Sequence, residues 1–82
     1  MQTKLLQSLL MDVAHDLVVK VPKRKLLWML DYKYDKPGAW ESLIEIWTDL
    51  GFSKSTLYGF EEREQIVLCS VVGVVEPVSN WA

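Results

Sequence analysis

The segment from Ala39 to Leu50 constrains the fold more than any other part of the chain, because its pattern predicts an amphipathic helix with a marked start and end. Its large apolar side chains recur at helical spacing and therefore share one face: Trp40, Leu43, Ile44, Trp47 and Leu50. A Pro-Gly break at residues 37–38 precedes it, and Gly51 is placed to take the left-handed conformation that ends many helices. The rest of the chain must supply a surface against which this face can pack.

Length and composition indicate one small domain. The chain has 82 residues, half of them hydrophobic, so we expect a single domain over residues 1–82 with a small core. Its one cysteine, Cys69, excludes an internal disulfide framework and a multi-cysteine zinc site, and favours a reducing cytoplasm. No apolar run approaches the roughly 20 residues of a membrane span, and we identify no targeting segment. We therefore expect a cytoplasmic protein that does not act at a membrane.

Charge is divided unevenly along the chain. Residues 1–37 carry seven Lys and Arg and four Asp, a net charge of +3. Residues 38–82 carry two Lys and Arg and seven Asp and Glu, a net charge of −5. This division suits self-association or a protein partner of mixed charge, although two ordinary solvated surfaces are the simpler interpretation.

The N-terminal segment predicts a second amphipathic helix, over residues 3–20. Its apolar side chains share one arc of a helical wheel: Leu6, Leu9, Leu10, Val13, Ala14, Leu17 and Val21. Pro22 ends the helix, because a proline pushes the preceding residue out of the helical region.

Residues 26–34 alternate in a way that predicts a β-strand. Leu26, Trp28, Leu30, Tyr32 and Tyr34 would face one way, and the residues between them the other. A helix over residues 23–32 is the competing interpretation, because Leu, Met and Lys are good helix formers.

The C-terminal third predicts further strands. Residues 52–60 are ambiguous between a strand and a short helix, whereas residues 65–75 are apolar on both faces and predict a central strand in which Cys69 is a buried thiol. We expect Trp81 to pack back onto the domain or to anchor a partner. The predicted fold is α+β: helix, strand, helix, strand, strand, with two helices packed on one face of a small antiparallel sheet.

One local motif suggests DNA binding. The sequence GFSKSTLY at residues 51–58, within residues 46–58, resembles the turn and recognition helix of TetR-like repressors, where GVSKGTLY is common. The resemblance implies a helix-turn-helix with Gly51 in the turn. The residues that it would direct at the major groove and the phosphates are Lys54, Ser55, Thr56 and Tyr58.

A second resemblance is one of arrangement only. A strand at 26–34, a helix at 39–50 and a new strand after Gly51 are similar to the start of the small ferredoxin-like ribonucleases of the CRISPR-associated and VapD types. Those enzymes place an aspartate at the end of the first strand, which Asp31 would match, with Asp35 as a candidate second carboxylate. The resemblance implies a divalent metal ion bound at a dimer interface.

The function that the sequence favours is non-catalytic binding of another protein, as an inhibitor, an immunity-type protein or a regulatory subunit. No catalytic, metal-binding or cofactor-binding signature stands out, and the one histidine, His15, is expected on the surface. Trp and Tyr are enriched at interface hot spots. The predicted contact residues are Trp28, Tyr32, Tyr34 and Trp81, with Lys23, Arg24 and Lys25 as a basic rim.

Overall fold

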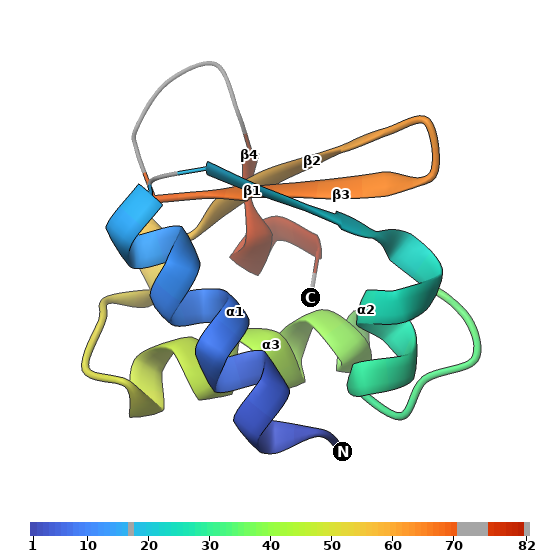
Figure 1. Ribbon diagram of the computed structural model, residues 1–82, viewed down its shortest axis with the longest axis horizontal. Helices are drawn as coiled ribbons and strands as arrows, with labels where there is room; N and C mark the ends of the chain where they lie inside the picture. The colour runs from blue at the N-terminus through green and yellow to red at the C-terminus, as the bar shows by residue number, and fades with distance from the viewer. Residues whose placement is uncertain (17, 71–75, 82) are drawn as a thin grey trace.

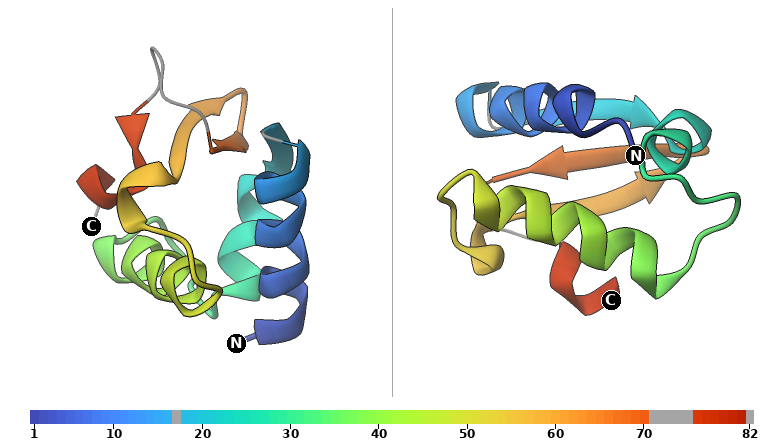
Figure 2. Two further views of the ribbon diagram at one scale, coloured as in Figure 1. Left: turned by 90° about the vertical axis from the view of Figure 1, so that its left-hand side faces the viewer. Right: turned by 90° about the horizontal axis from the view of Figure 1, so that it is seen from below.

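A computed structural model describes residues 1–16, 18–70 and 76–81 and has two layers (Figure 1), with three helices packed on one face of an antiparallel sheet. The elements in chain order are α1 (Thr3–Asp16), β1 (Val18–Pro22), α2 (Lys23–Met29), α3 (Pro37–Asp49), the 3-10 turn η1 (Lys54–Thr56), β2 (Tyr58–Glu62), β3 (Gln65–Cys69), β4 (Glu76–Pro77) and the 3-10 turn η2 (Val78–Trp81). Figure 2 shows α1, α2 and α3 on the same side of the sheet. The predicted α+β class is confirmed.

The sheet has the strand order β1-β3-β2-β4. The strand β3 pairs antiparallel with both β1 and β2, so residues 65–69 form the central strand that the apolar run predicted. The rest of that run, residues 71–75 with the predicted bulge at Gly73, lies outside the described residues. On the helix-facing side, Ile66 and Leu68 of β3 and Val21 of β1 join the core.

The first strand is not where the alternating pattern placed it. The predicted strand over residues 26–34 is wrong, and the first strand, β1, instead occupies residues 18–22, which overlap the end of the predicted helix 3–20. The helix α1 ends at Asp16, while Leu17 lies outside the described residues. Three valines in residues 18–21 explain the strand, because β-branched side chains fit a pleated sheet better than a helix. Pro22 is accommodated at the end of an edge strand, where a ladder hydrogen bond is dispensable.

The competing helical interpretation of residues 23–32 is the one that the structure supports. The helix α2 spans Lys23–Met29, a run of Lys, Arg, Leu, Trp and Met without a β-branched residue. Its end explains why the strand pattern was misleading: Asp31, not glycine, takes the left-handed conformation, with φ of 63°. The N–H groups of Asp31 and Tyr32 donate to the carbonyls of Trp28 and Leu27, which closes a Schellman motif.

The helix α3 confirms the predicted helix, starting two residues earlier at Pro37 and ending at Asp49. Gly51 has φ of +97°, and the N–H groups of Gly51 and Phe52 donate to the carbonyls of Thr48 and Trp47, as a second Schellman motif requires. The buried face differs slightly from the prediction, because Ile46 is buried and Ile44 is half-buried.

The ambiguous segment after α3 becomes one 3-10 turn and a strand. Residues 54–56 form η1 and Tyr58 begins β2, so the second helix of a helix-turn-helix does not form there. The strands β2 and β3 are joined by Arg63 and Glu64, which have φ of 48° and 63°. Two positive φ values are the signature of a tight two-residue hairpin turn, which here forms without the usual Asn or Gly.

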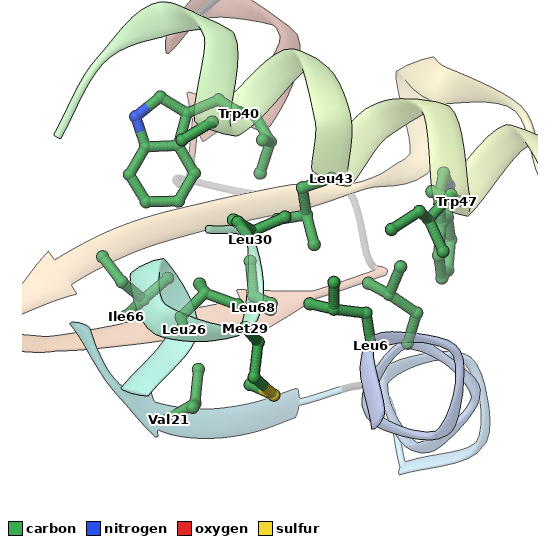
Figure 3. Close-up of a cluster of buried hydrophobic side chains, with 14 of the residues drawn as sticks. Leu6, Val21, Leu26, Met29, Leu30, Trp40, Leu43, Trp47, Ile66 and Leu68 are labelled. Atoms are coloured by element: carbon green, nitrogen blue, oxygen red, sulfur yellow. The ribbon is translucent and has the colours of Figure 1, made fainter. Parts of the chain in front are cut away.

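The core lies between the helices and the sheet (Figure 3). Leu43 of α3 points toward Leu30 and Leu68 in the centre of the core, Trp47 lies on the side of Leu6, and Trp40 lies at the other end, on the side of Ile66. Within the described residues, the structure contains no helix that is long and apolar enough to cross a membrane.

Candidate functional site

The face of the sheet that points away from the helices is unusually apolar. Two neighbouring rows, each with one residue from β1, β3 and β2, define what we call the outer patch: Val18, Cys69 and Tyr58 in the first row, and Lys20, Val67 and Phe60 in the second. Side chains alternate along a strand, so these rows point opposite to the core residues Ile66 and Leu68. All three helices lie on the other face (Figures 1 and 2).

In the outer patch, residues of the outer strands are exposed and residues of the central strand are buried. Val18 is 51% exposed and Phe60 is 39% exposed, whereas Val67 and Cys69 on the central strand are buried. A sheet face that meets only water normally carries polar side chains. An apolar face of this kind is therefore a candidate contact surface.

A second feature is a hollow of about 440 Å³ between α3, η2 and the β2–β3 hairpin. We call it the tryptophan pocket; it is lined by Asp35, Trp40, Phe60, Glu61, Ile66 and Trp81. The indole rings of Trp40 and Trp81 meet edge to face, with centroids 5.1 Å apart and planes at 69°. Phe60 lines the pocket and is also, by its register in β2, a residue of the outer patch.

Lys23 joins the two carboxylates at the pocket. Its Nζ lies 3.0 Å from Oδ2 of Asp35 and 2.9 Å from Oε1 of Glu61. The other Asp35 oxygen, Oδ1, accepts a 2.6 Å hydrogen bond from Nε1 of Trp40. The cluster therefore ties the start of α2 to the loop before α3 and to β2.

The geometry favours the charged forms of Asp35 and Lys23. Burial raises the pKa of the Asp35 carboxyl, but the hydrogen bonds from Lys23 and Trp40 and the charge of Lys23 outweigh it and hold the pKa below its usual value of 3.8. Hydrogen bonds to Glu61 and Asp35 raise the pKa of the Lys23 ammonium above its usual value of 10.5, against the opposing effect of its burial.

Removing the charge of Lys23 should make the free energy of unfolding depend less on pH. With Lys23→Met we expect a loss of less than about 1 kcal/mol of unfolding free energy between about pH 5 and pH 9, because the ion pairs are partly exposed. Because the pKa of Asp35 is lower in the folded state, ionised Asp35 stabilises the fold at any pH above the pKa that it has in the unfolded chain. This stabilisation is lost as the pH falls through the pKa that it has in the folded protein. The pKa of Lys23 is higher in the folded state, so protonated Lys23 stabilises the fold at any pH below the pKa that it has in the unfolded chain. This stabilisation is lost as the pH rises through the pKa that it has in the folded protein. Urea unfolding from pH 2 to pH 11 should therefore show the two proteins converging at both ends; a constant difference would contradict this.

The structure separates the residues predicted to contact a partner. Trp28, Arg24 and Lys25 are exposed on α2, and Tyr34 is exposed in the loop that follows. Tyr32 is half-buried against the core. Trp81 packs back onto Trp40, as one of the two predictions for the tail had it, and Lys23 belongs to the ion-paired cluster.

The residues of the two resemblances occupy other places. Lys54, Ser55 and Thr56 form the exposed turn η1, and Tyr58 belongs to the outer patch. Asp31 ends α2 and pairs with the Met1 amine, whereas Asp35 is held by Lys23 and Trp40. Within the described ranges no three His, Cys, Asp or Glu side chains are grouped as metal ligands would be.

Val18, Lys20, Phe60 and Glu61 were not predicted from the sequence as candidate site residues. The signal for the outer patch was present in part, since Tyr58 and Phe60 alternate along residues 52–60. Without the strand at residues 18–22, the part of the patch on the other side of β3 is missing. The position of Glu61 opposite Ile66 follows only from the register.

In comparisons with known proteins, no family model matches the sequence, and no similar curated protein or solved structure is found.

Proposed function

We propose that this chain is a small non-catalytic protein that acts by binding another protein, as an inhibitor, an immunity-type protein or a regulatory subunit. The outer patch is the observation that carries the proposal. It presents the exposed side chains of Val18 and Phe60 on a sheet face that the helices leave uncovered. Burying such a surface against a partner removes apolar area from water, which is the main favourable term in protein association.

Within the outer patch the charge favours a partner surface with an acidic group, while Glu62 lies one row further along the same face. The only charged residue of the outer patch is Lys20, which lies in the row of Val67 and Phe60. A partner that packs an apolar side chain on Phe60 and sets a carboxylate opposite Lys20 would match both features, and the carboxylate would mainly add specificity and association rate. The single, buried Cys69 fits a cytoplasmic setting for this encounter.

The face of α2 predicted from the sequence is a separate candidate surface. Arg24, Lys25 and Trp28 are spaced three and four residues apart and lie on the exposed side of this helix. We rank it second because the other large side chains of α2 are buried, so that Trp28 is its only exposed apolar anchor.

Purified wild-type protein and two sets of variants would test the proposal and choose between the faces. We would capture partners from an extract of the source cells, purify the retained protein, and measure its affinity for each variant by calorimetry. Val18→Asp and Phe60→Ser are expected to weaken binding by about 10-fold or more, because hot-spot truncations cost at least about 1.4 kcal/mol. Trp28→Ala is the control and is expected to keep the affinity.

Two results would count against this proposal. One is loss of binding with Trp28→Ala but not with Val18→Asp or Phe60→Ser, which would move the interface to α2. The other is absence of any protein that binds the purified chain directly. Unfolding midpoints of all variants must match the wild type, so that a loss of binding is not a loss of fold.

A further inference from the structure

We propose that the tryptophan pocket binds an arginine side chain presented by a peptide or protein ligand. Apart from Phe60, the residues that line the pocket lie outside the outer patch, so this site is independent of the proposed function. Its volume of about 440 Å³ lies within the range of small-ligand pockets. It is lined by the apolar residues Trp40, Phe60, Ile66 and Trp81 and by the acidic residues Asp35 and Glu61.

The charge balance selects a cation. Two carboxylates line the tryptophan pocket, and the single ammonium of Lys23 bridges them. Lys23 therefore leaves one net negative charge at the site. A neighbouring hollow of about 490 Å³ offers a contrast, because Lys23 and Arg24 there face Glu61 and Glu64 and the charges cancel.

The geometry of the acceptors leaves a place for a guanidinium. Both oxygens of Asp35 are engaged, by Trp40 and by Lys23. On Glu61 only Oε1 is engaged, and within the described part of the chain no hydrogen bond reaches Oε2. An incoming donor can therefore bind Oε2 of Glu61 without displacing Lys23.

The aromatic walls favour arginine over lysine. A guanidinium is planar, stacks on indole faces and is more weakly hydrated than an ammonium, so it loses less on entering a partly buried site. Trp81 supplies a half-buried ring for this contact, and Trp40 fixes that ring edge to face. The close approach of Trp81 to β2 depends on Gly59, since a Cβ there would lie 3.2 Å from the Trp81 ring.

The test is a titration of isotopically labelled protein with N-acetyl-Gly-Arg-Gly-amide, followed by the indole N–H signals in NMR spectra. We expect saturable shifts for Trp40 and Trp81 and none for Trp47, which lies two turns further along α3. The same peptide with lysine should bind more weakly, and the peptide with citrulline, a neutral isostere, should give no saturable shift. Shifts confined to Trp28, or no shifts at all, would overturn the proposal.

Three variants assign the roles. Glu61→Gln should weaken arginine binding about 2- to 5-fold, the range of a partly exposed ion pair. Trp81→Leu should weaken it about 3- to 30-fold, the range of a cation–π contact. Val18→Ser is the matched control, because Val18 belongs to the outer patch and does not line the pocket, and it should leave the affinity unchanged. Since Trp81→Leu can also disturb the fold, Glu61→Gln on the exposed rim is the deciding variant.

A fourth peptide separates arginine from other cations. The peptide with trimethyllysine offers a cation that cannot donate a hydrogen bond to Glu61. Weaker binding than that of the arginine peptide supports the assignment. Tighter binding, unaffected by Glu61→Gln, would overturn it in favour of a quaternary ammonium held by the aromatic rings alone.

Discussion

Replacing Trp47 by alanine is expected to lower the free energy of unfolding by about 3–5 kcal/mol. The side chain is fully buried and stacks on Phe52, with ring centroids 4.4 Å apart. Its Nε1 donates to the carbonyl of Ser53 at 2.9 Å and lies 3.2 Å from Oγ1 of Thr56. The substitution thus removes core area and also releases the chain that leads from α3 into β2. A domain of this length has only about 4–12 kcal/mol of stability in all.

Urea unfolding followed by far-UV circular dichroism would measure this loss, with the slope checked for two-state behaviour. Trp47→Phe is the matched variant, because it keeps an aromatic ring against Phe52 but removes the N–H donor. We expect it to cost about 1–2 kcal/mol, since Ser53 O also accepts from Thr56. Equal costs for the two substitutions would show that the hydrogen bonds, rather than the buried area, dominate at this site.

The helix α3 was predictable because every local signal agreed. The apolar spacing, the Pro-Gly start and the Gly51 end all specify one helix, and the structure contains it with a Schellman motif at Gly51. The strand β1 was not predictable in this way, because Val21 continues the apolar arc of the helix predicted over residues 3–20. The helical spacing of apolar residues thus continues by chance into residues 18–22, which form a strand of the sheet.

Two positions show how tertiary structure overrides local signals. Asp31 ends α2 in a conformation for which glycine is the usual marker, and Arg63 with Glu64 forms a hairpin turn that usually contains Asn or Gly. Each residue accepts a positive φ that is unfavourable for a side chain. Packing of α2 and pairing of β2 with β3 supply the compensating free energy, which no local pattern reveals.

The candidate site was harder to predict than the fold, because its parts are distant in sequence. The tryptophan pocket brings Asp35 and Trp40 together with Glu61, Ile66 and Trp81. The outer patch depends on pairing of residues 18–20 with residues 67–69. Trp40 and Trp81 were each singled out by the sequence, but their contact follows only from the way η2 returns to α3.

The segment where the strand prediction was wrong gives the second large effect. Leu26→Ala is expected to lower the free energy of unfolding by about 2–5 kcal/mol, because the side chain is fully buried on the inner side of α2. Trp28→Ala is expected to change it by no more than about 0.5 kcal/mol, because Trp28 is 56% exposed. Both substitutions introduce alanine, the best helix former, so neither result reflects a loss of helix propensity.

This pair of variants distinguishes the strand interpretation of residues 26–34 from the helix interpretation. In a strand, Leu26 and Trp28 lie on the same face, so both substitutions would be costly or both would be mild. In a helix they are about 200° apart, so one is buried when the other is exposed. Urea midpoints measured side by side decide between them: a difference of several kcal/mol requires the helix, and similar costs would refute α2. Loss of partner binding by Trp28→Ala at unchanged stability would in turn assign the exposed side of this helix to recognition.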